Sequence, residues 1–282
     1  MIIGKKPIPK IGALFNVIIM NSVQIEKCIC EPDECDTFQF MAKRLNMNVL
    51  HPGGLKATKL LAEQSKMSKN MIVLDAGCGT GSSSIFLAQK YGCKVVGIDV
   101  DQQSLIKANK IGRRKNLLDR VSFRNMDIVD LRFEDGTFDG AIYQAALIFT
   151  NKSKALNAIH SKLRPEGFLG IIELAWKTTP PISIARKVGS ILCAAAVNTE
   201  EHLMWIKLLN QTGFNVVNAE LEDLNFNFRG MLYNEGVLSA LRIAFKCALD
   251  KYAKKKTRDV TKLFKETRKY LGYGIYVARK KE

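Results

Sequence analysis

The chain has 282 residues, of which 47% are hydrophobic and 25% are charged. This composition is that of an ordinary globular protein, and it excludes wholesale disorder, a collagen-like repeat and a short disulfide scaffold. No stretch reaches the roughly 18 uncharged apolar residues that cross a bilayer, so we expect no membrane span. The seven cysteines are an odd number. They cannot form a complete set of disulfides within the chain, which favours a reducing, cytoplasmic location.

Positive charge is in excess and unevenly distributed. Lysine and arginine number 43 against 27 aspartates and glutamates, a net charge of +16. Residues 251–282 alone carry 12 basic and 3 acidic residues. Such a segment indicates an anionic partner, such as nucleic acid or an acidic lipid surface, or else a solvated helix face. A helix lying on a membrane also needs a continuous apolar stripe, and Val260, Leu263 and Phe264 supply only a short one.

The predicted elements begin after an irregular N-terminal segment. Residues 1–50 show no sustained hydrophobic period, and we interpret them as an N-terminal extension or cap. His51-Pro52-Gly53-Gly54 predicts a turn, because proline fixes φ and glycine permits positive φ, and a short helix follows over residues 55–62. From Met71 onward, buried-strand patterns alternate with helical ones. The predicted strands are 71–75, 94–99, 121–125, 138–143 and 168–174, and the predicted helices are 81–91, 102–115 and 151–163.

The second half of the chain is less regular, and residues 177–198 carry no clear pattern. Thr199 is the predicted N-cap of the helix that follows. The remaining predicted elements are a helix over 199–211, a strand over 214–219, a mostly helical segment over 232–270 and a last strand over 274–278. The predicted fold is therefore α/β: a doubly wound, mostly parallel seven-stranded sheet with helices on both faces, an N-terminal cap, and helical insertions near the C-terminus.

A glycine-rich turn joins the first predicted strand to its helix. It reads Asp75-Ala76-Gly77-Cys78-Gly79-Thr80-Gly81, and glycines there let the backbone bend tightly and let a ligand approach without a Cβ in the way. In a doubly wound sheet that ligand lies at the carboxyl ends of the strands. Asp99 ends the next strand, 24 residues after Asp75. Its carboxylate can accept two hydrogen bonds from a ribose diol and would repel a ribose 2′-phosphate.

Other interpretations of this turn fit less well. A dinucleotide fingerprint needs G-x-G-x-x-G, but the third glycine position falls on Ser82. The carboxylate of Asp75 also fits an ammonium or sulfonium group better than a pyrophosphate. A Walker loop is excluded because no Gly-Lys-Ser or Gly-Lys-Thr occurs. A turn that binds no ligand is disfavoured by the accompanying Asp99.

Several ordered motifs extend this pattern over roughly residues 70–217. They are Val73–Gly81, Val96–Asp101, Met126–Ile128, Phe138–Ile142, Leu163–Phe168 and Thr199–Val217. Together they resemble the motifs of the class I S-adenosylmethionine (SAM) methyltransferases, in the order in which that family carries them. The resemblance implies SAM as cofactor, S-adenosylhomocysteine (SAH) as its product, and a SAM-binding methyltransferase domain over residues 51–282.

The resemblance also implies a role for each matching residue. Gly77, Gly79 and Gly81 would pass close to the methionine part of SAM, with Cys78 in the same loop and Asp75 near the ammonium group. Asp99 would bind the ribose hydroxyls and Val100 would pack on the adenine. Asp127 would accept a hydrogen bond from the adenine amino group, and Ile128 would lie beside the adenine ring. Gln144 would lie near the methyl group of SAM.

The acceptor is less constrained by the sequence. After the fourth strand the chain reads Gln144-Ala145-Ala146-Leu147, without the Asn-Pro-Pro-Tyr of many amino-methylating members, and no Pro-Cys of a cytosine C5 enzyme occurs. Nucleic acid is therefore a possible but not a favoured partner. Residues 177–198 and 224–270 are predicted as substrate-covering insertions that enclose a pocket with the N-terminal cap, and a closed pocket suits a small molecule. Ordinary packing of these segments is the alternative.

Two further features of the sequence have open roles. His51 faces the site as a base or is a structural residue. Cys28, Cys30 and Cys35 place three thiols close together, but zinc would need a fourth ligand and no histidine is nearby, so we predict no metal site.

We therefore predict a SAM-dependent methyltransferase that acts on a small molecule. The alternatives are an RNA or protein methyltransferase that uses the basic C-terminal region, and a non-catalytic SAM- or SAH-binding subunit that supports a partner. No pattern in the sequence specifies an oligomeric state.

Overall fold

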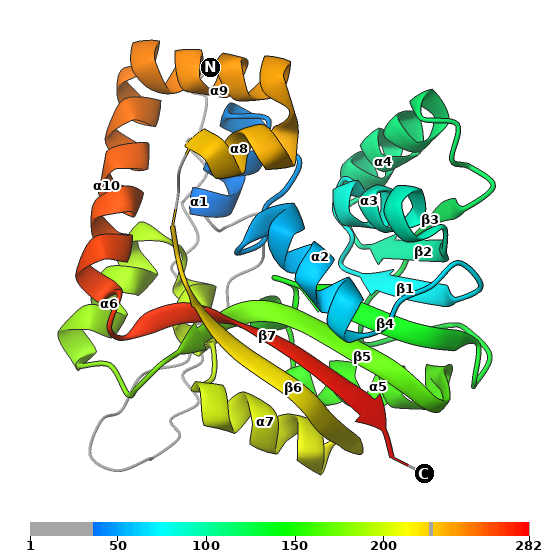
Figure 1. Ribbon diagram of the computed structural model, residues 1–282. Helices are drawn as coiled ribbons and strands as arrows, with labels where there is room; N and C mark the ends of the chain where they lie inside the picture. The colour runs from blue at the N-terminus through cyan, green and yellow to red at the C-terminus, as the bar shows by residue number, and fades with distance from the viewer. Residues whose placement is uncertain (1–35, 226–227, 282) are drawn as a thin grey trace, which may run out of the picture.

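The computed structural model describes residues 36–225 and 228–281 of the chain. The strands of its central sheet are β1 (Ile72–Ala76), β2 (Lys94–Asp99), β3 (Val121–Asn125), β4 (Phe138–Gln144), β5 (Leu163–Trp176), β6 (Phe214–Asp223) and β7 (Leu271–Lys280). Their order across the sheet is β3-β2-β1-β4-β5-β7-β6 (Figure 1). The order reverses between β1 and β4, which is the switch point of a doubly wound sheet and the usual place of its ligand.

The last strand differs in direction from the others. β1 to β5 pair in parallel, whereas β7 is antiparallel to both of its neighbours, β5 and β6. Sequence alone predicts only a short last strand over 274–278, but β7 has ten residues because it pairs along its length with two long neighbours. The predicted fold class, a mostly parallel seven-stranded sheet, is confirmed.

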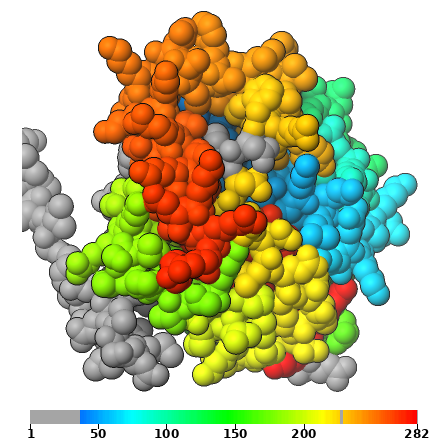
Figure 2. All heavy atoms as spheres, turned by 60° about the vertical axis from the view of Figure 1, so that its left-hand side comes forward, coloured from blue at the N-terminus to red at the C-terminus, as the bar shows by residue number. Residues whose placement is uncertain are grey.

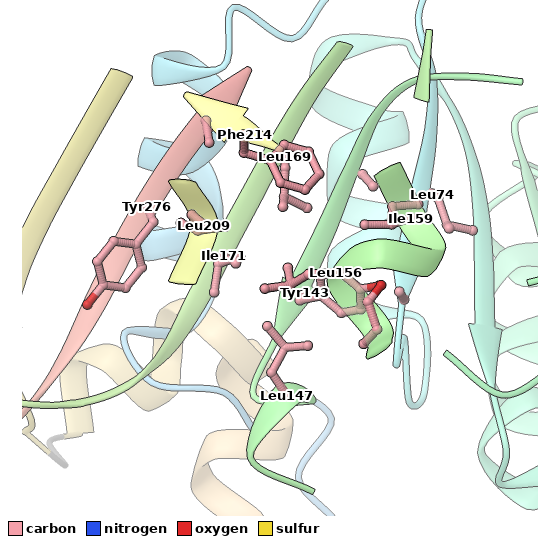
Figure 3. Packing of buried hydrophobic residues seen from close by; sticks show 14 of the residues in the cluster. Leu74, Tyr143, Leu147, Leu156, Ile159, Leu169, Ile171, Leu209, Phe214 and Tyr276 are labelled. Carbon is pink, nitrogen blue, oxygen red and sulfur yellow. The ribbon is translucent and has the colours of Figure 1, made fainter. Parts of the chain in front are cut away.

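Helices cover both faces of this sheet (Figure 1). The helices packed on the sheet are α2 (Gly54–Gln64), α3 (Ser82–Tyr91), α4 (Gln102–Arg114), α5 (Lys152–Lys162) and α7 (His202–Gln211). One hydrophobic cluster joins α2 and α3 to one face, and another joins α5 and α7 to the other. Figure 3 shows Leu156 and Ile159 of α5 and Leu209 of α7 gathering with strand residues such as Tyr143. Parallel strands buried on both faces explain the continuous apolar runs in the sequence.

A second, helical layer lies beyond the carboxyl ends of β4 and β5. Its elements are α1 (Asp36–Gln39), a π-helical turn η2 (Phe40–Arg44), two 3-10 turns η3 (Leu147–Phe149) and η4 (Ala194–Asn198), and α6 (Ile182–Ile191), α8 (Phe228–Glu235), α9 (Val237–Leu249) and α10 (Lys251–Thr267). Two hydrophobic clusters hold this layer together. Figure 2 shows α9 and α10, in orange to red, forming the outer edge of this part of the molecule.

Thr199 does not cap α7, so that prediction is wrong. The N-cap is Glu201, because Trp176 N donates to Glu200 O at 3.0 Å and a β-bridge joins Trp176 to Glu201, which keeps residues 199–201 extended beside β5. Thr199 is buried instead, and its hydroxyl donates to Leu174 O. The Thr199 hydroxyl, which we expected to cap the helix, therefore makes a tertiary hydrogen bond to β5.

The short apolar stripe of the basic C-terminal segment faces inward. Val260 and Leu263 of α10 are buried in the hydrophobic cluster that also contains Val188 of α6. These residues therefore hold α10 against the rest of the protein and are not free to contact a membrane. Among the helices of the described residues, none combines the length and the apolar character that a bilayer crossing requires.

Candidate functional site

The glycine loop between β1 and α3 is tied to β2. Gly77 N and Cys78 N donate to Ile98 O at 2.8 and 2.9 Å, and Gly79 N donates to Asp99 Oδ2 at 2.8 Å. Every one of these acceptors belongs to the last two residues of β2. The loop is thus preorganised at the carboxyl ends of two neighbouring strands, where sequence reasoning places the cofactor.

The glycines of this loop are required for different reasons. At Gly77 (φ +82°) a Cβ would lie 2.7 Å from Ala146 Cβ, and at Gly81 (φ +73°) it would lie 2.6 Å from the Phe123 ring. At Gly79 (φ +52°) a Cβ would meet no atom within 4 Å. Gly77 and Gly81 therefore allow close packing, whereas Gly79 borders open space that a bound cofactor can occupy.

Asp75 at the end of β1 is almost fully buried. Its Oδ2 accepts a hydrogen bond from Ser84 Oγ of α3 at 2.5 Å. Burial raises the pKa of Asp75 to about 6, and the nearby Asp99 adds to this rise while the Ser84 bond opposes it. A buried carboxylate with this pKa gains from a neighbouring positive charge, as the predicted ammonium role requires.

Asp99 has both carboxylate oxygens engaged by backbone. Oδ2 accepts from Gly79 N, and Oδ1 accepts from Asp101 N at 2.9 Å. Burial raises its pKa above the ordinary value, and these N–H groups hold the rise back. Each oxygen keeps a further lone pair for a hydroxyl group. Val100, the next residue, is 61% exposed, which is unusual for valine and matches a side chain that packs on a flat ligand.

The segment after β3 lies beside the end of β2. Met126 N donates to Asp99 O at 3.1 Å, so Asp127 and Ile128 follow within two residues of that contact. Asp127 is exposed, and its Oδ1 accepts from Val129 N at 3.0 Å. Ile128 packs partly against the core. The structure therefore brings these two predicted adenine-side residues to the same sheet edge as Asp99.

Gln144 at the end of β4 is connected to His51 through Thr58. Thr58 Oγ1 donates to Gln144 Oε1 at 2.7 Å and lies 3.3 Å from His51 Nε2, which is also 3.2 Å from Ser83 Oγ. Gln144 is 8% exposed, and its buried Nε2 has no hydrogen-bond partner. Because unpaired buried donors are costly, this amide group fits a site that is completed by a bound molecule.

The His51 ring is neutral in this setting. Burial lowers its pKa to about 4, and its Nδ1 lies 3.1 Å from Pro52 O. Since a carbonyl oxygen only accepts, Nδ1 carries the proton and Nε2 keeps its lone pair. The other two histidines have structural contacts: His160 Nε2 with Gly213 O at 3.1 Å, and His202 Nδ1 with Tyr276 Oη at 3.2 Å.

A cavity of about 380 Å³ lies beyond the carboxyl ends of β4 and β5. His51 and Ala145 line it on the side of the predicted cofactor residues. Its lining also includes Val49 from the N-terminal segment, Leu192 from the segment after β5, and Met231 from α8. Most of the lining residues are aliphatic or aromatic, so the cavity suits an apolar molecule.

Glu173 was missed by sequence reasoning. It lies on β5 with no exposed surface, borders the cavity, and its oxygens accept from Leu147 N at 3.0 Å and Leu174 N at 3.1 Å. Burial raises its pKa to about 7. The sequence does contain one indication of this residue, because Glu173 is the single acid in the apolar run of residues 168–176. Its contacts fix the turn after β4, beside the glycine loop.

The described residues contain no group of three histidine, cysteine or acidic side chains arranged to hold a metal ion. Cys28, Cys30 and Cys35, whose role was left open, lie outside the described residues. Cys78 is buried in the glycine loop, and burial raises the pKa of its thiol, so the group is uncharged at neutral pH.

Comparison with known proteins agrees with this geometry. The family model for the methyltransferase domain matches residues 73–167. O-methyltransferase cnsE of Penicillium expansum is 30% identical over 201 residues, which is 71% of this chain and 67% of that protein. The methyltransferase YodH of Bacillus subtilis is 28% identical over 179 residues, or 62% of this chain and 75% of that protein.

Solved structures share the fold. A SAM-dependent methyltransferase from Geobacter sulfurreducens, crystallised with SAH, superposes with a TM-score of 0.62 at 22% identity and covers 86% of this chain and 96% of its own. The fold, the glycine loop with its paired acid and the relatives define a class I methyltransferase. The chain belongs to the SAM-dependent methyltransferases, and SAM is its methyl donor.

Proposed function

We propose that this methyltransferase acts on an apolar small molecule held in the cavity beyond β4 and β5. The cavity carries the proposal, because 380 Å³ is within the range of small-molecule sites and far too little for a polymer. His51 and Ala145 connect it to the predicted cofactor residues. Relatives with the name O-methyltransferase support a small acceptor with a reactive oxygen.

The proposal assigns SAM to the carboxyl ends of β1 to β4. Gly77, Cys78, Gly79 and Gly81 face its methionine part, and Asp75 offers its carboxylate to the ammonium group. The remaining contacts come from Asp99 to the ribose, from Val100, Asp127 and Ile128 to the adenine, and from Gln144 near the methyl group. Bound SAM supplies an activated methyl group. The protein's contribution is to hold the acceptor in line with it and to exclude water, which is how most of the rate is gained in such transfers.

The residues around the cavity receive a covering role in the proposal. In the described part of the N-terminal segment, residues 36–50 act as a cap, and residues 177–198 and 224–270 are the substrate-covering insertions of the methyltransferase domain over residues 51–282. His51 lies on the acceptor side, where its neutral ring helps to position the acceptor; with a pKa of about 4 it is too weak a base to take the acceptor's proton near neutral pH. The described cysteines Cys78, Cys93 and Cys247 form no disulfide, which supports a reducing cytoplasmic location.

A transfer assay with radiolabelled SAM tests the proposed acceptor class. A panel of hydrophobic phenols and alcohols is offered in one set of reactions, and bulk RNA and a protein extract in others. We expect label in organic-extractable products and none in the polymers. Met231→Trp should abolish this label by filling the cavity while SAH binding is retained.

The matched control is Leu238→Trp, at an exposed position of the neighbouring helix; it should leave the label unchanged. Label in RNA or protein would instead support a polymer acceptor. SAH binding without any transfer would support a non-catalytic SAH-binding subunit.

A further inference from the structure

The outer face of α9 carries an apolar stripe that no described residue covers. Leu238, Leu241, Phe245 and Leu249 are between 53% and 85% exposed. Their spacing of three and four residues places them on one side of the helix. Leucine and phenylalanine do occur singly on surfaces, but a contiguous row of this kind marks an interaction site.

α9 is apolar on its other side as well. Ala240 and Ile243 are fully buried, and Ala244 and Cys247 pack against the same cluster, which includes Met231 from the cavity wall. Ser239, Arg242 and Lys246 separate the two apolar faces on one side of the helix, and an apolar helix face is ordinarily covered. Here the inner face packs on the protein, and the outer face is the one that lacks a covering partner among the described residues.

The charge around this stripe is strongly positive. Residues 237–258 contain seven lysines and arginines and a single acid, Asp250, and that acid is paired with Arg44 at 2.7 Å. The cationic residues Lys254, Lys255 and Arg258 lie exposed on α10, next to α9. Arg258 is paired with Asp259 at 3.8 Å, which leaves Lys254 and Lys255 as the exposed lysines at the start of α10. Apolar side chains next to exposed lysines are the features of a surface that binds the interface of an anionic bilayer.

We propose that the outer face of α9 inserts into the headgroup region of an anionic lipid bilayer, with the basic residues of α10 contacting lipid phosphates. A second copy of this chain is a poorer occupant, because the same positive charge would oppose itself across the contact. RNA is also poorer, because a phosphate backbone would leave the leucines uncovered. Because α9 packs on residues that border the cavity, a docked protein would hold that cavity next to the membrane.

Vesicle flotation of the full chain tests this proposal. The vesicles are phosphatidylcholine mixed with phosphatidylglycerol, compared with phosphatidylcholine alone. We expect the protein to float with the anionic vesicles, at least tenfold less with the neutral ones, and less at high salt. Leu238→Ser combined with Phe245→Ser should reduce flotation at least tenfold, and Lys254→Glu with Lys255→Glu should also reduce it.

Matched controls separate this surface from general effects. Leu203→Ser changes an exposed leucine on α7, and Lys107→Glu with Lys110→Glu makes the same charge change on α4; both should float like the wild type. SAH binding by every variant shows that the fold and the cofactor site are intact. The proposal is overturned if the wild type does not float, or if the α9 variant floats normally.

Two other outcomes also overturn the proposal, the first by assigning vesicle binding to residues 1–35 and the second by assigning the stripe to a second copy of the chain. One is flotation that survives the α9 changes but is lost on deletion of residues 1–35. The other is a dimer in sedimentation velocity that the α9 changes dissociate, without any vesicle binding.

Discussion

Gly79 N donates to Asp99 Oδ2 at 2.8 Å, so the two motifs that identify the cofactor site are joined by a direct hydrogen bond. The loop cannot change its position without disturbing the acid. The Asp99 carboxylate therefore holds the glycine loop in place and is also predicted to bind the ribose of SAM. Substitutions of Asp99 can separate the effect on folding from the effect on cofactor binding.

Replacing Asp99 should weaken cofactor binding more than folding. Asp99→Asn keeps an oxygen for Gly79 N but loses the charge and one acceptor, and Asp99→Ala loses both acceptors. We expect SAM and SAH binding to fall at least tenfold, about 1.4 kcal/mol, with the larger loss for alanine. Titration calorimetry measures this, with NADH as a second ligand and Asp119→Asn, an exposed acid, as the control. Unchanged SAM binding would remove Asp99 from the site.

Alanine at Gly77 and at Gly79 should have different consequences. Both positions have positive φ, which costs a non-glycine residue about 1 kcal/mol. Gly77→Ala would also place its Cβ 2.7 Å from Ala146 Cβ, so we expect it to lower the urea midpoint clearly. Gly79→Ala should fold nearly normally but bind SAH weakly, because its Cβ enters the space assigned to the cofactor. If the two variants lost SAH binding and stability to the same extent, the assignment of Gly77 to packing and of Gly79 to the cofactor space would be wrong.

Glu173 should make the folded state sensitive to pH near neutrality. Its folded pKa, about 7, lies above the ordinary value of 4.5 because the group is buried. Its contribution to stability is therefore fully present below the unfolded pKa and is lost as pH rises through about 7. We expect the melting temperature of the wild type to fall between pH 6 and pH 8.5, and Glu173→Gln to show a smaller fall. The same fall in both proteins would assign this dependence to other groups.

Thr199→Val should destabilise the protein without affecting cofactor binding. The substitution keeps the shape of the side chain but removes the hydroxyl that donates to Leu174 O. Trp205 Nε1 donates to the same carbonyl at 3.1 Å, so that oxygen keeps one partner. We expect a loss of about 1 kcal/mol in the free energy of unfolding, measured by urea denaturation. Thr212→Val, which loses a hydroxyl bonded within its own helix end, is a suitable comparison.

The sequence predicted most of the sheet and little of the layer above it. Strands such as Lys94–Asp99 are specified by local runs of apolar residues, and the glycine loop is specified by its need for positive φ. Both could therefore be predicted from short stretches of sequence. The carboxylate of Glu173 and the hydroxyl of Thr199 depend on partners that are far away in sequence or in another strand, and local patterns carry no such information. The roles of the predicted SAM-binding residues stay predictions that the Asp99 and Gly79 variants address.

The position of β7 imposes an order on the assembly of the protein. β6 has no pairing with β5, and both are joined only through β7, which is made after them. During synthesis the edge of β5 therefore stays open until residues 271–280 leave the ribosome. An open edge invites wrong pairing, so a chain that ends before residue 271 should aggregate more readily than the full chain.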